Sequence, residues 1–209
     1  MEDSSSSAKR VKDRYARAAA FYDLLENLTA GSNEASWRRV AWSRAEGPNV
    51  LEVGVGTGRN FSYYPAGVQV TGIDFSENML KRAREKSAGQ GIHVHLSLMD
   101  IQNMEFADDT FDTVVGTFVF CTVPDPVRGL SEVRRVLKPG GKLVLLEHVL
   151  SENRATATVM NLVNPVVWWM FGGNINRRTV ETVATCGFAI EQVTPSGGAD
   201  RLIEGRRRF

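Results

Sequence analysis

Apolar residues near the start of the chain recur at the spacing of an amphipathic helix. Between residues 8 and 28 they stand three or four positions apart, so they share one face of a helix. The members of this stripe are Val11, Tyr15, Ala18, Tyr22 and Leu25. Gly31 is expected to end the helix, and Ser32 or Asn33 can cap a second helix that carries Trp42.

Beyond Gly47-Pro48, short apolar runs alternate with helical periodicity. The runs that predict strands are residues 50–53, 68–73, 92–98, 111–119, 142–148, 188–193 and 201–207. The segments that predict helices are residues 76–86, 126–137 and 178–186, with an apolar stretch that Pro165 is expected to interrupt. This succession predicts an α/β fold, a parallel sheet covered by helices on both faces. The short link 195–200 predicts that the last two strands are antiparallel.

Composition narrows the class of protein. The chain has 209 residues, of which 43% are hydrophobic, and 25 Lys+Arg balance 24 Asp+Glu. It is long enough for one domain, too apolar to be disordered, and too evenly charged for a uniformly basic nucleic-acid-binding domain. Cys121 and Cys186 are too few for a disulfide framework. The polar N-terminus resembles no signal peptide and no apolar stretch is long enough to span a bilayer, so we expect a cytoplasmic protein.

A glycine-rich turn follows the first predicted strand directly. It reads Gly54-Val-Gly56-Thr57-Gly58, and its glycines let the backbone bend sharply and let a ligand approach the main chain. Asp74 ends the next strand, where a carboxylate can accept hydrogen bonds from ribose hydroxyls. The sequence therefore predicts a nucleoside site at the carboxyl ends of the first two strands.

Two details separate this turn from the G-x-G-x-x-G turn of dinucleotide-dependent dehydrogenases. The third glycine is Gly58, and Arg59 follows it. Glu52 lies two residues before Gly54, where its carboxylate repels a pyrophosphate and favours a cationic ligand. An adenosine with a positively charged tail, S-adenosylmethionine, fits this pattern.

Three motifs resemble the successive signatures of class I S-adenosylmethionine-dependent methyltransferases. They are Glu52-Val-Gly-Val-Gly-Thr-Gly58, Gly72-Ile-Asp74-Phe-Ser-Glu-Asn-Met79 and Leu137-Lys-Pro-Gly-Gly141. The resemblance implies a Rossmann-like, doubly wound sheet of seven strands, with the last strands antiparallel and helices on both sides. It divides the chain into a basic helical cap or lid, residues 1–45, and a methyltransferase domain, residues 46–209.

The resemblance also implies roles for the matching positions, with S-adenosylhomocysteine as the product. The expected neighbours of the cofactor are Glu52, Gly54, Gly56, Thr57, Gly58, Thr117 and Phe118 for the methionine part, Asp74 for the ribose, and Phe75, Met79, Asp100 and Ile101 for the adenine. For Phe75 and Met79, ordinary core packing is the alternative.

The residues after the fourth and fifth strands bear on the acceptor. The segment after the fourth strand lacks the Asp/Asn-Pro-Pro-aromatic sequence of methyltransferases that act on nucleobase amino groups, so no nucleic-acid partner is expected. His148, which ends the fifth strand, is a candidate base or orienting residue, with a hydrogen-bonded structural histidine as the alternative. Strand alternation places only one of Glu147 and His148 in the cleft. His93 and His95 have no further ligand near them, so we expect no metal site.

Two segments outside the cofactor motifs are unusual. The first half of the N-terminal helix carries the basic residues Lys9, Arg10, Lys12, Arg14 and Arg17. Such a helix can lie on an anionic membrane or be a solvated face over the core. As a lid over the cofactor it makes Tyr15 and Tyr22 catalytic candidates. Trp168 and Trp169 can face lipid, line an acceptor pocket or pack in the core.

A finer resemblance links the chain to bacterial phospholipid N-methyltransferases and animal thiol methyltransferases, and more loosely to quinone C-methyltransferases. The motifs are Thr117-Phe-Val-Phe-Cys-Thr-Val123, Leu146-Glu-His-Val149 and Gly173-Asn-Ile-Asn-Arg177. They imply a lipid or lipophilic acceptor, with the amino headgroup of phosphatidylethanolamine as the leading expectation, and peripheral contact with the inner membrane surface. A small thiol or quinone-type acceptor, and a cofactor-binding protein without catalysis, are the alternatives. Asn174, Asn176 and Arg177 are expected to contact a phosphate or to cap the following helix.

Overall fold

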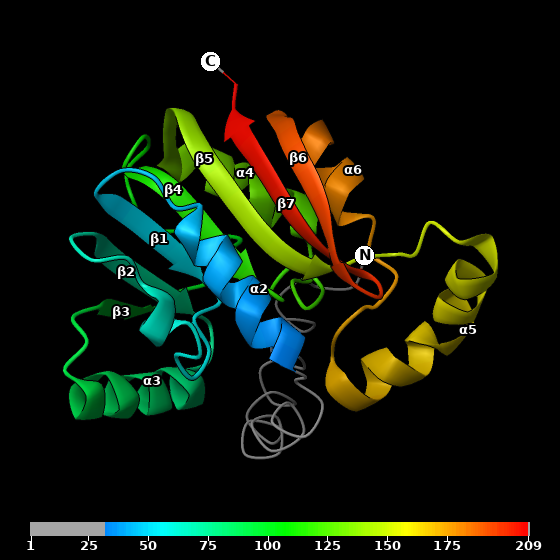
Figure 1. Cartoon of the computed structure of the whole chain (residues 1–209), viewed down its shortest axis with the longest axis horizontal. Helices are drawn as coiled ribbons and strands as arrows, with labels where there is room; N and C mark the ends of the chain where they lie inside the picture. Colours follow the sequence, from blue (N-terminus) through cyan, green and yellow to red (C-terminus); the bar gives the residue numbers. More distant parts are fainter. Residues whose placement is uncertain (1–31, 209) are drawn as a thin grey trace.

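The structure, a computed structural model, describes residues 32–208 (Figure 1). The expected first helix, with its basic residues and the catalytic candidates Tyr15 and Tyr22, therefore lies outside the described residues. Within residues 32–208, none of the helices combines the length and the apolarity that crossing a bilayer requires.

The described chain is organised around one seven-stranded sheet in the order β3-β2-β1-β4-β5-β7-β6 (Figure 1). The strands are β1 Asn49–Val53, β2 Gln69–Asp74, β3 His95–Leu98, β4 Phe111–Thr117, β5 Leu137–His148, β6 Phe188–Gly197 and β7 Asp200–Arg207. β1 to β5 pair in parallel, and β7 runs antiparallel to both β5 and β6. The predicted α/β class, the seven strands and the antiparallel pair at the end are confirmed.

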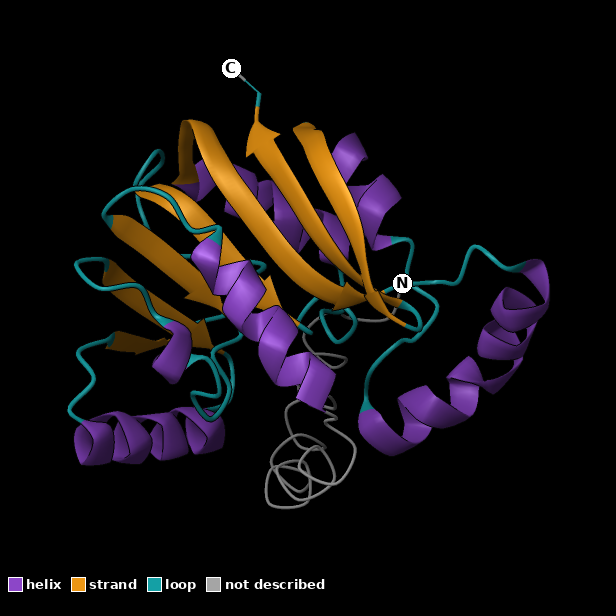
Figure 2. Cartoon of the chain, in the orientation of Figure 1, coloured by secondary structure: helices purple, strands orange, loops and turns teal. Residues whose placement is uncertain are grey.

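Helices cover both faces of this sheet (Figure 2). They are α2 Ser32–Ser43, α3 Glu77–Gln90, α4 Pro126–Val136, α5 Arg154–Phe171 and α6 Thr179–Thr185, with a short 3-10 turn, η1, at Phe61–Tyr63. α2 and α3 lie on one face, and α4 and α6 lie on the other (Figure 1). Ser32 is already part of α2 rather than a residue before it. α3 and α4 begin at capping side chains, because Ser76 and Asp125 accept hydrogen bonds from backbone N–H groups of the first turn.

The central strands carry buried apolar side chains on both of their faces, because each face is covered. Alternate side chains of β5 go to different layers: Leu143 and Leu145 pack in the core against α4, whereas Val144 and Leu146 pack in the core beneath α2. Trp42, fully buried, is the largest side chain that α2 adds to its layer. The sheet thus forms a rigid base whose carboxyl ends carry the loops of the site.

β4 ends two residues before the expected limit of residue 119. The reason is local, since Phe118 has a positive φ of 59°, which takes the chain out of the extended region. The buried carboxylate of Glu147 then accepts hydrogen bonds from the N–H groups of Val119 (2.8 Å) and Phe120 (3.0 Å), which therefore do not continue the sheet. β3 is also shorter than expected, because it begins only at His95.

Pro165 does not interrupt α5, and this expectation is wrong. The helix runs without a break from Arg154 to Phe171, and Figure 2 shows it curving as it lies apart from the sheet. Proline removes one backbone donor, which leaves the carbonyl of Asn161 without its helical partner. Asn161 is exposed, so water can bond to that carbonyl and the helix continues.

We expect Trp42→Ala to lower the free energy of unfolding by about 3–5 kcal/mol. The ring is fully buried beneath α2, and its centroid lies 4.3 Å from that of Tyr64. Denaturant titration measures the change. Val127→Ala is the control, since Val127 is 52% exposed on α4, and it should cost less than about 1 kcal/mol. Equal losses in the two variants would contradict the packing described here.

Candidate active site

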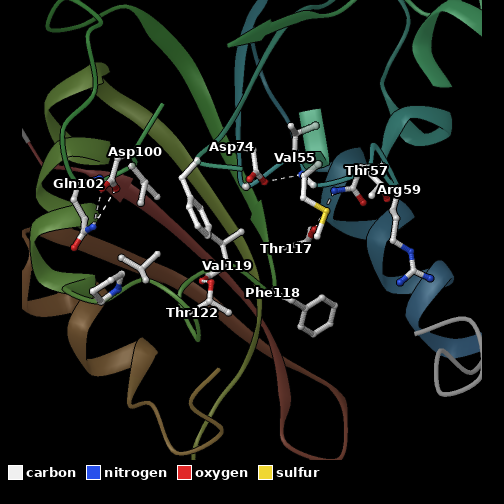
Figure 3. A pocket seen from close by; sticks show the side chains of 18 of the residues that line it. Val55, Thr57, Arg59, Asp74, Asp100, Gln102, Thr117, Phe118, Val119 and Thr122 are labelled. Carbon is white, nitrogen blue, oxygen red and sulfur yellow. Dashed lines mark hydrogen bonds between the residues drawn. The ribbon is translucent and has the colours of Figure 1, made fainter. Parts of the chain in front are cut away.

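A pocket opens at the carboxyl ends of β1, β2 and β4, where a doubly wound sheet is expected to bind ligands. Its lining includes ten of the twelve predicted cofactor residues: Gly54, Gly56, Thr57, Asp74, Phe75, Met79, Asp100, Ile101, Thr117 and Phe118. Figure 3 shows Asp100 and Gln102 at one end of this lining, Arg59 at the other, and Asp74 between them. The remaining two of the twelve predicted cofactor residues, Glu52 and Gly58, are buried and do not line the pocket.

The glycine turn requires its glycines for two different reasons. Gly54 and Gly56 both have positive φ, +64° and +57°, which disfavours any residue with a Cβ. At Gly54 a Cβ would also lie 2.5 Å from Cγ2 of Val119, whereas at Gly56 it would meet nothing within 4 Å. Gly54 therefore allows close packing against the β4 loop, and Gly56 leaves open space at the wall of the pocket.

Asp74 stabilises the turn as well as facing the pocket. Its Oδ2 accepts a hydrogen bond from the N–H of Gly56 (2.9 Å), and its Oδ1 accepts one from the N–H of Ser76 (2.9 Å). Burial raises the pKa of Asp74 to about 6, although both hydrogen bonds oppose the shift. Each oxygen retains a second lone-pair direction, so the carboxylate can still accept from a ligand hydroxyl.

Glu52 lies fully buried directly behind the glycine turn. Asn60 Nδ2 donates to its Oε1 at 2.6 Å, and the Tyr64 hydroxyl donates to its Oε2. Burial raises the pKa of Glu52 to about 7, while the bonds from Tyr64 and Asn60 and the nearby charge of Arg38 oppose the shift. Its negative charge therefore acts on the pocket without direct contact.

Arg38 of α2 is a pocket residue that the sequence did not indicate. Its Nη1 donates to Thr117 Oγ1 (2.7 Å) and to Asn60 Oδ1 (3.1 Å), and its Nε donates to Glu34 (2.8 Å). The guanidinium also stands 5.2 Å from the centre of the Phe118 ring. These contacts join α2 to β4 across the sequence, and no local pattern in the chain signals them.

Of the two candidates at the end of β5, neither lines the pocket. Glu147 is buried and holds the loop after β4, as described above, and burial raises its pKa to about 7. His148 is about one-third exposed, and its Nδ1 lies 2.7 Å from Oδ1 of Asp200, the first residue of β7. Alternation along β5 places His148 on the same face as Leu146, which is the face that carries α2.

The remaining candidates fall at the edges of the molecule. His95 lies near Ser97 Oγ (3.2 Å), and no metal-binding cluster occurs within residues 32–208. Trp168 and Trp169 are exposed, so of the three expectations for them core packing is wrong.

Asn174 and Asn176, which belong to the motif Gly173-Asn-Ile-Asn-Arg177, do not cap α6 with their side chains. The capping position is Arg178, which makes no side-chain capping bond. Instead Asn174 and Asn176 bond to the side chains of Asn164 (3.1 Å) and Asn161 (2.9 Å), respectively. The segment after α5 is therefore fastened to α5 itself.

Comparison with known proteins defines the class. A family model described as a methyltransferase domain matches residues 51–145. A possible histamine N-methyltransferase of Thermotoga maritima, a solved S-adenosylmethionine-dependent methyltransferase, superposes with a TM-score of 0.70 at 20% identity, covering 94% of this chain and 99% of that one. At this identity the likeness shows the fold.

Three relatives extend the comparison. The chain is 45% identical over 124 residues to phosphatidylethanolamine N-methyltransferase of Cereibacter sphaeroides (58% of this chain, 61% of the relative). It is 34% identical over 178 residues to a ubiquinone/menaquinone biosynthesis C-methyltransferase of Geobacter sulfurreducens (78% and 69%). It is 30% identical over 192 residues to a thiol S-methyltransferase of Rattus norvegicus (89% and 73%). The match to the Cereibacter sphaeroides enzyme spans less than two thirds of that enzyme's length.

The chain belongs to the S-adenosylmethionine-dependent methyltransferases, and the predicted enzyme class and cofactor are confirmed. The residues of the pocket suit this cofactor. The Asp74 carboxylate in the lining can accept from hydroxyl groups, the Glu52 carboxylate behind the lining favours a cation, and open space at Gly56 lets a ligand approach the backbone. The two aspartates, Asp74 and Asp100, lie at different places along the lining (Figure 3).

We expect Gly54→Ala to destabilise the protein more than Gly56→Ala does. Both variants force alanine into a left-handed conformation at a cost of about 1–2 kcal/mol. Only Gly54→Ala adds the clash with Val119, worth about a further 1–3 kcal/mol. Thermal and denaturant unfolding of the two variants without cofactor measure the difference; equal stabilities would mean that the Val119 contact does not constrain the turn.

Proposed function

We propose that this methyltransferase acts on an amphipathic acceptor at a membrane surface, most of all on the amino headgroup of phosphatidylethanolamine. The observation that carries the proposal is the exposed apolar face of α5. The name and the 45% identity of the Cereibacter sphaeroides relative support the headgroup.

The exposed face of α5 has the features of a helix that lies at a lipid interface. Its members, which helical periodicity brings to one side, are Val159, Leu162, Val163, Val166 and Trp169. Leu162 is 78% exposed and Trp169 is 69% exposed, and Arg154 is the one charged residue of the helix. Soluble proteins rarely leave such a continuous apolar stripe in water. Tryptophan at one end suits the boundary between acyl chains and headgroups.

The pocket residues then hold the cofactor, which supplies an electrophilic methyl group on a sulfonium. In our proposal Asp74 accepts from the ribose hydroxyls, Asp100 and Ile101 meet the adenine, and the buried charge of Glu52 favours the sulfonium end. Thr117 and Phe118 close the methionine side. Arg38 belongs to the described part of the proposed N-terminal cap, residues 1–45, and joins that region to the site.

His148 is the proposed general base. An amino headgroup is an ammonium ion at neutral pH, and it can attack the methyl group only after losing a proton. The Asp200 carboxylate, at 2.7 Å from Nδ1, orients the imidazole and leaves Nε2 to accept that proton. The positive charge that develops on the ring is stabilised by the same carboxylate.

A small thiol or a quinone-type compound is the second candidate acceptor. The relatives named for these substrates match more of this chain, 89% and 78%, than the phospholipid enzyme does. The exposed α5 face is equally compatible with a lipophilic quinone precursor dissolved in the membrane. Identifying the molecule that receives the methyl group therefore distinguishes the two candidates.

We expect methyl-labelled cofactor to transfer its label to phosphatidylethanolamine in vesicles that also contain phosphatidylglycerol. Leu162→Glu with Trp169→Glu should reduce vesicle co-sedimentation and lipid methylation about tenfold or more, because it places charge on the lipid-facing stripe. Ala155→Glu, at an exposed position in the first turn of α5, is the matched control. Label that enters thiols or quinols while the lipid stays unlabelled would reject the proposal in favour of the second candidate.

We expect the affinity for S-adenosylmethionine to rise with pH up to about 7. Without ligand, the raised pKa of Glu52 means that the folded protein binds a proton more tightly than the unfolded chain, so stability falls between about pH 4.5 and 7. The cationic cofactor prefers the ionised carboxylate. Glu52→Gln should flatten the pH dependence of the dissociation constant and weaken binding at pH 7.5 about tenfold.

Calorimetric titrations at several pH values test the Glu52 prediction. Glu77→Gln is the control, because Glu77 is exposed and pairs with Arg84. Asp74 and Glu147 also have raised pKa values, so Glu52→Gln should remove only part of the pH dependence of stability. An unchanged pH profile of cofactor binding would show that the charge of Glu52 does not act on the ligand.

We expect His148→Gln to lower kcat about 10²- to 10⁴-fold near neutral pH, while leaving the cofactor dissociation constant unchanged. The loss should shrink at alkaline pH, where the acceptor amine is already free. Steady-state kinetics over a pH series measure this, and added imidazole should restore part of the activity. His93→Gln, at an exposed position, is the control. A uniform loss at every pH would indicate a structural histidine instead.

A further inference from the structure

Arg177 lies beside the pocket, in the segment that follows α5. It belongs to the segment that connects α5 to α6, and its carbonyl accepts a hydrogen bond from the N–H of Leu150 (2.8 Å). Its Nη2 donates to the carbonyl of Val123 at 3.1 Å. Val123 and its neighbour Thr122 line the pocket, and Figure 3 shows the position of Thr122.

In the described part of the chain, the charge of this guanidinium has no partner of opposite sign at contact distance. Within residues 32–208, no carboxylate oxygen lies within 4.0 Å of the side chain of Arg177, and its Nε is buried without a hydrogen bond. Cys121 and Asp125 are the titratable groups whose charges act on it, and Asp125 is engaged as the cap of α4. The adjacent Arg178, by contrast, is exposed and pairs with Glu181 at 3.2 Å.

Burying a cation without an anion is unfavourable, so a half-buried arginine with unused donors suits an anionic ligand. Partial burial lowers the pKa of Arg177, which reports the cost of this environment. Guanidinium donors form a fork that matches two oxygens of a phosphate. The Nη donors that remain after the bond to Val123 are therefore available for such a group, whereas the buried Nε is not.

The position of Arg177 indicates how the amine, the phosphate and the acyl chains of an amphipathic acceptor are arranged along the site. The connecting segment lies directly against the loop after β4, since the N–H of Asn174 donates to the carbonyl of Cys121 at 2.8 Å. Arg177 itself bonds to Val123 of the pocket lining, and Asn174 and Asn176, just before it in the chain, bond to α5. An acceptor whose amine lies toward the pocket and whose acyl chains lie along α5 has its phosphate between the two.

We propose that Arg177 binds the phosphate group of the acceptor and thereby selects phosphate-bearing amphiphiles over neutral quinols and thiols. The inference rests on the proposed function and extends it from the reacting amine to the anionic part of the substrate. A lipid phosphodiester and free phosphate both carry oxygens that a guanidinium can bind, and the experiment distinguishes these two ligands.

The test uses the full chain saturated with S-adenosylhomocysteine and measures binding by calorimetry. The probes are glycerophosphoethanolamine, ethanolamine without phosphate, and inorganic phosphate. Arg177→Met should weaken the binding of glycerophosphoethanolamine about 10- to 100-fold, and Arg177→Lys less, whereas ethanolamine should bind the variants and the wild type alike. Arg178→Met is the matched control and should change nothing. Wild-type binding of inorganic phosphate as tight as that of glycerophosphoethanolamine would mark a free-phosphate site and overturn acceptor recognition.

Two further outcomes overturn the proposal: wild-type protein that does not bind glycerophosphoethanolamine, and an affinity that Arg177→Met and Arg177→Lys leave unchanged. Unchanged affinity for S-adenosylhomocysteine shows that a variant is folded. If Arg177→Met does not fold, Arg177→Lys provides the test instead. Methylation of phosphatidylethanolamine is measured separately. Lipid methylation that persists unchanged in Arg177→Met refutes the phosphate site but keeps the proposed function, whereas intact phosphodiester binding without lipid methylation refutes the function.

Discussion

The geometry of the site depends on the buried carboxylate of Glu52. A buried charge is tolerated only when its oxygens are hydrogen-bonded, and here Asn60 and Tyr64 supply those bonds. Asn60 also donates to Thr117 at 3.0 Å and accepts from Arg38. One network therefore holds β1, β4, α2 and the turn before η1 in a single relative position, and the floor of the pocket is the surface that this network supports.

A second buried carboxylate, that of Glu147, has the corresponding role at the loop after β4. Glu147 bonds the N–H groups that follow Phe118, so the chain leaves β4 at a fixed point and presents Phe118 to the pocket. The loop that continues from there is joined to the segment after α5 through Asn174 and Arg177. The fold thus connects the pocket to the apolar helix α5 by a short, hydrogen-bonded path, which suits the amphipathic acceptor that we propose.

The sequence alone determined the architecture and the chemistry of the cofactor. Seven apolar runs separated by helical segments are a local property, and each became a strand of the sheet. The spacing of the glycine turn and Asp74 indicated a nucleoside, and Glu52 indicated a cation. The turn could be predicted because Glu52 and its three glycines lie within seven residues and therefore stay together at the end of β1. Asp74 could be predicted because it ends β2, the strand that pairs with β1.

Only the tertiary structure decided which side chains meet across the sequence. Arg38 reaches Thr117 and His148 reaches Asp200, and neither pair carries a periodic or motif-like signal, because long-range contacts depend on how the layers pack. The structure also placed Glu52 behind the pocket rather than in it, since burial on β1 leaves it no open side. Sequence pattern specifies what an element buries, whereas packing of the whole sheet decides what its ends bring together.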